Sequence, residues 1–145
     1  MNPPRLRLEN PSSTSERRAN GADGEAPVVF VVDDEVRIAD SASLILRGAG
    51  FQVHTFYDGA EVISQTPEVA PDVVVTDFAM PKVNGLALAA WVREHYPQCR
   101  VVMVTGHAAL LEEADRKQFL LLNKPVHPRE LIAVVKKISV AKKAA

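Results

Sequence analysis

The sequence predicts a three-layer α/β sandwich built on a five-stranded parallel sheet. From Pro27 onward, short runs of apolar residues alternate five times with segments whose apolar residues recur at helical spacing. Most of the apolar runs are continuous and rich in valine, as expected for strands that helices cover on both faces. Strands that alternate with helices in this way form parallel sheets joined by right-handed crossovers.

The composition indicates one globular domain and argues against several classes of partner. The chain has 145 residues, of which 47% are hydrophobic and 24% charged. Its 17 basic and 18 acidic side chains give a net charge of −1, which disfavours electrostatic binding to nucleic acid or to a membrane surface. We find no apolar run of membrane-spanning length and no signal-peptide core, and a single cysteine excludes an internal disulfide. We therefore expect a cytoplasmic protein.

The chain divides into a tail, a domain and a short end. Residues 1–26 are predicted to be a disordered N-terminal tail, because residues 10–25 offer almost no side chain to bury. The folded domain is predicted to span residues 27–141. Residues 142–145 form a short basic C-terminal end.

One stretch of the tail departs from its polar character. Leu6 and Leu8 alternate with Arg5 and Arg7, a pattern too short to predict a strand. A flexible extension is the favoured interpretation, and a docking peptide is the alternative.

The first half of the domain contains two predicted strands and two predicted helices. Residues 28–32 form the first strand and end at Asp33-Asp34. The next helix stops at Gly50. Its apolar residues at helical spacing are Ile38, Ala42, Ile45, Leu46 and Ala49. Residues 51–56 alternate in polarity and predict an edge strand, after which Asp58 can cap a short helix.

The second half repeats this order three times. Residues 73–76 form a strand that runs into Asp77, and Asn84 caps a helix that ends near Tyr96. Residues 101–104 form the fourth strand and 109–117 a short helix. Residues 119–122 form the fifth strand, and Pro128 opens the last helix.

Polar side chains follow these strands at the positions where ligands bind. In an open parallel sheet the carboxyl ends of the strands meet at one edge, and the residues there are Asp33, Asp34, Asp77, Thr105 and Lys124. Three neighbouring carboxylates repel one another unless cations join them. One lysine and a hard divalent cation such as Mg²⁺ would balance them, and such a site suits phosphoryl transfer to a carboxylate nucleophile. Singly, each residue could equally be a helix cap, a turn residue or a solvent lysine; together they favour a site.

Four segments resemble the signature of two-component receiver domains. They are VVDDE (31–35), VVTDFAMPKVNG (74–85), MVTGH (103–107) and NKPV (123–126). The resemblance covers nearly everything outside the tail. It implies a flavodoxin-like fold with strand order 2-1-3-4-5.

The resemblance also implies a role for each site residue. Asp77 would be the phosphoacceptor, Asp34 would bind Mg²⁺ directly, and Asp33 would bind it through a water. The backbone carbonyl of Ala79 would complete the protein ligands.

Two further residues would act on the phosphoryl group. Thr105 would contact its oxygens and Lys124 would pair with them, aimed by a cis Lys124–Pro125 peptide bond. The domain would take phosphate from a sensor histidine kinase or phosphotransfer protein. It would be no enzyme beyond its own Mg²⁺-dependent phosphorylation and dephosphorylation.

Several positions depart from the family pattern. Leu121 stands where most receivers have an aromatic residue or histidine, so the usual switch is in question. Thr105 and Lys124 lie only 19 positions apart, which predicts a trimmed fourth helix. Gly106 replaces the commoner alanine, and His107 occupies a position that tunes phosphate lifetime, as does Ala79.

The expected output is a protein contact rather than DNA binding. The face made by the fourth helix, fifth strand and fifth helix would bind an unknown output protein or a second copy of the chain. We expect part of an apolar set there to be exposed: Leu110, Leu111, Ile132 and Val135.

Other functions were weighed against this one. A phosphatase or phosphotransferase of the haloacid-dehalogenase type would need a second aspartate where Ala79 stands. A degenerate receiver acting as an interaction or dimerisation module is favoured by Leu121, but the complete set of site residues argues against it. Nucleotide binding has little support, because no phosphate-binding glycine motif occurs.

Overall fold

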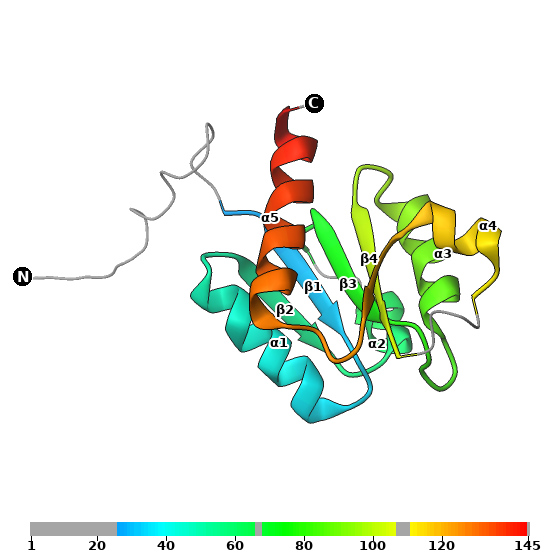
Figure 1. The fold of residues 1–145 in the computed structure, drawn as a ribbon. Coiled ribbons are helices and arrows are strands. Elements are labelled where there is room, and N and C mark those ends of the chain that lie inside the picture. The colour runs from blue at the N-terminus through cyan, green and yellow to red at the C-terminus, as the bar shows by residue number, and fades with distance from the viewer. Residues whose placement is uncertain (1–25, 66–67, 107–110, 145) are drawn as a thin grey trace, which may run out of the picture.

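The computed structural model describes residues 26–65, 68–106 and 111–144, in which five strands alternate with five helices (Figure 1). The strands are β1 Val28–Val32, β2 Gln52–Phe56, β3 Val73–Asp77, β4 Arg100–Thr105 and β5 Leu120–Asn123. The helices are α1 Val36–Gly48, α2 Gly59–Gln65, α3 Gly85–His95, α4 Glu113–Gln118 and α5 Pro128–Ala144. The tail predicted for residues 1–26 lies outside the described residues, apart from Ala26.

The strands form one parallel sheet in the order β2-β1-β3-β4-β5. This confirms both the fold class and the strand order that the sequence predicts. The central strands β1 and β3 are buried along their whole length, whereas β2 at the edge is only partly covered. The continuous apolar runs of β1 and β3 therefore mark strands between two helical layers, and the alternating run of β2 marks one edge. At the other edge, β5 is apolar but only partly buried.

The helices cover the two faces of the sheet. Helices α1 and α5 lie together on one face, and Ala39 and Leu46 pack there with Val135 and Ile138. On the other face α2 and α3 bury Val62, Leu88 and Val92 against the sheet. Successive side chains of each strand point to opposite faces of the sheet, so every strand contributes residues to both hydrophobic cores. Each helical layer therefore packs against the sheet.

Helix α1 buries a face one residue away from the one that its apolar pattern suggests. The fully buried positions are Ala39, Ser43 and Leu46, whereas Ile38 is 40% exposed. Ser43 fits inside because its hydroxyl forms a hydrogen bond with that of Thr55, at 2.7 Å. The apolar side chains of Ile38, Ala42 and Ile45 line a groove that is described below.

Two predicted helix caps are confirmed. The Asp58 side chain accepts a hydrogen bond from the Glu61 backbone N–H at 2.8 Å, and Asn84 accepts one from the Ala87 N–H at 2.9 Å. Gly50 follows α1 with a φ of +102°, a conformation that favours glycine. Local side-chain chemistry thus fixes where these elements begin and end.

The region around α4 departs most from the sequence expectation. Helix α4 has six residues, begins later than predicted, and residues 107–110 lie outside the described residues. The guanidinium of Arg93 lies 5.6 Å from the centre of the Phe119 ring, which ties the end of α4 to α3.

The apolar patch predicted near this region does not form from its described members. Leu111 and Val135 are 5% and 0% exposed, and Ile132 packs partly buried against the core. Leu110 lies outside the described residues. Leu111 precedes α4, which begins at Glu113, so helical spacing does not describe where its side chain points. On β5 the exposed apolar residue is Leu120, at 43%.

The outer edge of β2 is covered by a side chain from α1. Gln52 and Phe56 form backbone hydrogen bonds toward β1, so the Val53 carbonyl between them points to the outer edge. Arg47 donates to that carbonyl at 3.0 Å and to the Thr55 hydroxyl at 3.4 Å. The guanidinium therefore satisfies an acceptor that a further strand would otherwise pair with.

Within the part of the chain that the structure describes, no helix is both long and apolar enough to cross a bilayer.

Candidate metal and phosphoryl site

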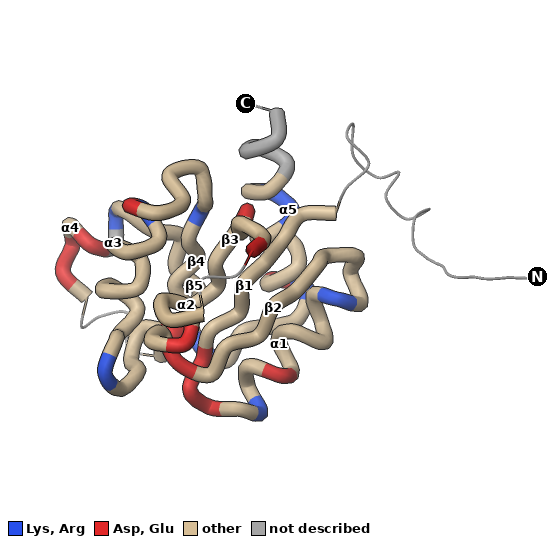
Figure 2. The backbone as a smooth tube through the Cα atoms, turned by 180° about the vertical axis from the view of Figure 1, so that it is seen from behind, with Lys and Arg blue, Asp and Glu red and all other residues tan. Residues whose placement is uncertain are grey.

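The register of β1 and β3 brings two aspartates to one edge of the sheet. Val32 is paired with Thr76, so Asp33 and Asp77 follow at the adjacent ends of parallel strands. Figure 2 shows acidic positions gathered at this end of the sheet. The juxtaposition follows from the parallel arrangement alone and needs no special loop.

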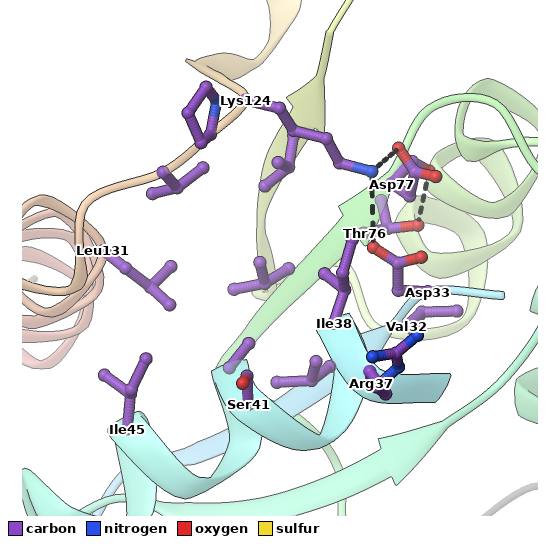
Figure 3. Close-up of a pocket in the computed structure, with 16 residues that line it drawn as sticks. Val32, Asp33, Arg37, Ile38, Ser41, Ile45, Thr76, Asp77, Lys124 and Leu131 are labelled. Atoms are coloured by element: carbon purple, nitrogen blue, oxygen red, sulfur yellow. Dashed lines mark hydrogen bonds and ion pairs between the residues drawn. The ribbon is translucent and has the colours of Figure 1, made fainter. Parts of the chain in front are cut away.

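Lys124 reaches both carboxylates from the far end of β5. Its ammonium nitrogen lies 3.2 Å from Asp77 Oδ1 and 3.6 Å from Asp33 Oδ2 (Figure 3). The Lys124 backbone N–H donates to the Thr105 carbonyl at 3.0 Å, which anchors the start of the loop to β4. The predicted cis Lys124–Pro125 peptide bond is present. The Lys124 side chain thus reaches across β4 to Asp77, and across β4 and β3 to Asp33.

A third acid completes the cluster. Oxygens from Asp33, Asp34 and Asp77 all lie within 4.8 Å of one another. Asp33 and Asp77 are buried, at 5% and 7% exposure, whereas Asp34 is exposed. Three carboxylates at this spacing, one open to solvent, fit a hard divalent cation that keeps some of its water ligands.

Burial and neighbouring charges together raise the pKa values of Asp33, Asp77 and Lys124. Burial raises the pKa of the Asp77 carboxyl above its ordinary value, and the charge of Lys124 offsets this only in part. Burial also raises the pKa of Asp33, opposed by a hydrogen bond from the Glu35 N–H and reinforced by the charge of Asp77. For Lys124, burial lowers the pKa but the carboxylates of Asp33 and Asp77 outweigh it and raise the pKa overall. The lysine stays charged, and the acids gain from any further cation.

The backbone around Asp77 is held closely. Thr76 donates from its hydroxyl to the Asp77 carbonyl at 2.9 Å, and the Phe78 N–H donates to Val104 at 3.0 Å. A Cβ on Gly85 would come within 2.6 Å of the Asp77 carbonyl oxygen and of the Met103 sulfur. Only glycine lets the start of α3 approach β3 this closely, and this contact fixes where the Asp77 carboxylate sits.

The remaining predicted residues occupy the same edge. Thr105 ends β4 and is 1% exposed, and Ala79 is exposed two positions after Asp77. Their contacts with a phosphoryl group and a metal ion remain predictions, as do the assigned roles of the acids. His107 lies outside the described residues.

Sequence reasoning missed a groove that opens beside the site. Its cavity volume is about 620 Å³, and it lies between α1 and the loop that leads from β5 into α5. Ile38 and Ile45 form one wall and Leu131 the other, with Asp33, Asp77 and Lys124 at one end (Figure 3). The signal in the sequence was the helical spacing of Ile38, Ala42 and Ile45, which predicted the helix but not the groove beside it.

Comparison with known proteins agrees with this geometry. The model of the response regulator receiver domain family matches residues 29–136. The chain belongs to the response regulator receiver family. It is therefore a receiver domain of two-component signalling. Receivers of this family bind Mg²⁺ at an acidic pocket, and this chain has a cluster of three acids.

Relatives and solved structures extend the comparison. The DNA-binding transcriptional regulator NtrC of Escherichia coli is 34% identical over 113 residues, which are 76% of this chain and 24% of NtrC. The DNA-binding response regulator MtrA of Mycobacterium tuberculosis is 28% identical, over 74% of this chain and 48% of MtrA. This receiver therefore spans between a quarter and a half of these relatives.

Among solved structures, a CheY-like receiver from Methanospirillum hungatei superposes with a TM-score of 0.74 at 21% identity, over 83% of this chain and 98% of its own. A receiver from Clostridium thermocellum gives 0.72 at 26% identity, over 81% and 98%. The fold is that of these receivers.

Proposed function

We propose that this receiver takes a phosphoryl group onto Asp77 and signals through protein contacts. The observation that carries the proposal is the buried Asp77 carboxylate, 3.2 Å from the Lys124 ammonium group and beside two further acids. A carboxylate in this setting is a positioned nucleophile, with charges ready to neutralise the incoming group.

The donor is the phosphohistidine of a sensor histidine kinase or of a phosphotransfer protein. An oxygen of Asp77 forms a bond to phosphorus while the bond between phosphorus and the imidazole nitrogen breaks. The electron pair of that bond stays on the nitrogen, and the imidazole leaves neutral because its other nitrogen carries a proton. Lys124 neutralises one phosphoryl oxygen, and Thr105 donates a hydrogen bond to another.

The residues present fit Mg²⁺, since they offer only oxygen ligands, and three carboxylates beside one lysine lack two positive charges. Asp34 and Asp77 would hold the ion directly, Asp33 would hold it through a water, and the Ala79 carbonyl would complete the protein ligands. When bound, Mg²⁺ supplies charge neutralisation at the phosphoryl oxygens. The chain catalyses only its own phosphorylation and the slow hydrolysis of its aspartyl phosphate.

The output is a contact made by α4, β5 and α5, either with an output protein or with a second copy. The exposed Leu120 on β5 supports this face. Nucleic acid and membranes are not partners of the domain, and it acts in the cytoplasm. A degenerate receiver that binds without phosphorylation is the second candidate, and Leu121 in place of the usual aromatic residue favours it.

Incubation with acetyl phosphate and Mg²⁺, followed by intact mass measurement, tests the proposal. The wild type should gain one phosphoryl group and Asp77→Asn should gain none. Asp72→Asn makes the same change at the other end of β3 and should label like the wild type. Equal labelling of Asp77→Asn and wild type would remove Asp77 from its role, and no labelling of the wild type would favour the degenerate receiver.

A further inference from the structure

The groove beside the acids is an apolar surface that the phosphoryl chemistry does not use. The walls contributed by Ile38 and Ile45 on α1 and by Val126 and Leu131 beyond β5 are apolar. Ile38 keeps 40% of its surface exposed although it faces this hollow. A cavity of about 620 Å³ with such walls favours an apolar side chain over water.

One end of the groove has a different character. Asp33 and Asp77 lie there. Arg37 also lines the groove, but among the described residues only the Lys124 ammonium group forms an ion pair with these two acids. A ligand that matches the whole groove therefore carries apolar side chains followed closely by a positive charge.

The chain itself contains such a segment. Among residues 1–25 the large apolar side chains are Met1, Leu6 and Leu8, and the two leucines alternate with Arg5 and Arg7. Elsewhere in these residues the arginines stand at positions 17 and 18, with no large apolar neighbour. The apolar and basic requirements of the groove are met together only at residues 5–8.

The tether is long enough to bring this segment to the groove. The described chain begins at Ala26, just before β1, at the end of the sheet opposite to the acids. Residues 9–25 span up to about 60 Å when extended. The five residues of β1 cover about 17 Å, so the groove at the other end of the strand lies well within reach.

We propose that residues 5–8 dock in this groove, with Leu6 and Leu8 against its apolar walls and an arginine beside Asp33 and Asp77, where it competes with Mg²⁺. The competition with Mg²⁺ rests on the function proposed above; the docking itself does not. Because the segment is tethered, weak contacts suffice to occupy the groove. The segment thereby restrains phosphorylation until the Mg²⁺ concentration or a partner displaces it.

Docking is tested in the full chain by paramagnetic relaxation. A spin label at Asn10→Cys in a Cys99→Ser background should broaden the methyl signals of Ile45 and Leu131. It should leave Val62, on the opposite face, unchanged. Leu6→Ser with Leu8→Ser should abolish the broadening without any change of charge.

A matched pair of variants tests the groove itself. Ile38→Ser should weaken the broadening, whereas Leu44→Ser should not, because Leu44 lies on the same helix, is 71% exposed and does not line the groove. Equal broadening in all variants, or none in the parent protein, would overturn the docking of residues 5–8 and would favour a segment of another protein as the occupant of the groove.

Competition is measured by calorimetric titration with Mg²⁺. Arg5→Gln with Arg7→Gln should tighten Mg²⁺ binding about fivefold. Arg17→Gln with Arg18→Gln removes the same amount of charge from elsewhere in residues 1–25 and should leave the Mg²⁺ affinity unchanged. An equal gain in both variants would indicate general charge attraction and would overturn the competition. Failure of Mg²⁺ to bind at all would overturn both the competition and the proposed metal site, while the relaxation experiment would still decide the docking.

Discussion

Two aspartates at opposite ends of β3 in this receiver, one just before the strand and one at its last residue, are used in opposite ways. At the start of β3, the Asp72 carboxylate accepts a hydrogen bond from the Val28 N–H at 2.8 Å. The Asp72 backbone also bonds to Val28 and Arg100, so this residue joins β1, β3 and β4. At the end of β3, the Asp77 carboxylate faces two other acids and one lysine.

The difference shows how one sheet separates stability from chemistry. The charge of Asp72 is used to hold strands together through backbone donors. The charge of Asp77 is buried near two other carboxylates, which is unfavourable for the folded protein. A bound cation would offset this, and the arrangement is typical of a functional site. We expect substitutions at the two ends to have opposite effects on stability, and the following experiments test this, from the largest effect to the smallest.

Gly85→Ala should destabilise the domain by about 3 kcal/mol, because the new Cβ would lie 2.6 Å from both the Asp77 carbonyl oxygen and the Met103 sulfur. Urea denaturation measures this loss. Gly48→Ala on α1 is the control, since a Cβ there meets nothing within 4 Å and should be neutral or slightly stabilising. Similar stabilities for the two variants would mean that the approach to Asp77 is not tight.

Asp72→Ala should cost about 2 kcal/mol, because it leaves the buried Val28 N–H without its carboxylate acceptor. Asp72→Asn keeps an acceptor oxygen and should recover most of the loss. Urea denaturation measures the stabilities of both variants. An Asp72→Ala protein as stable as the wild type would contradict the structural role of Asp72 and with it the contrast between the two ends of β3.

Asp77→Asn should raise the free energy of unfolding by about 1 kcal/mol when no divalent cation is present, since it removes a buried charge from among like charges. Saturating Mg²⁺ should shrink or reverse the difference, because only the wild type gains the full binding energy. Thermal unfolding with and without Mg²⁺ measures both effects. A destabilised Asp77→Asn protein under metal-free conditions would contradict the raised pKa of Asp77.

The smallest expected effect is on the pH dependence. Because the pKa of Asp77 is raised above 3.8, the folded protein holds a proton that the unfolded chain has lost in the range just above that value. The wild type should therefore lose stability relative to Asp77→Asn as pH rises through this range, by less than about 1 kcal/mol per pH unit. A constant difference between the two proteins from pH 4 to 7 would argue against the raised pKa.

The sequence predicted the site better than its surroundings. The residues at the strand ends were identified because each interrupts an apolar run, and the parallel sheet then places them together. Sequence could not tell that Asp33 is buried while its neighbour Asp34 is exposed, because this depends on how the chain turns into α1.

Features that depend on distances between elements were not predictable. Predicting the role of Asp72 requires the register of β3 against β1. Predicting the groove requires the distance between α1 and α5. Which members of the apolar set near α4 are buried could not be predicted for the same reason, since helical spacing describes a face but not what packs on it. Residue patterns along one element predict that element, whereas contacts between elements require the fold.

The guanidinium of Arg47 at the rim of β2 has a consequence for assembly. With the Val53 carbonyl already accepting from Arg47, a neighbouring molecule that tries to continue the sheet on this side must share this acceptor with the guanidinium or displace it. Growth into fibrils or ribbons through β2 is thereby discouraged at the cost of a single side chain. A solution that is crowded with this protein is thus protected from one route to irreversible polymerisation.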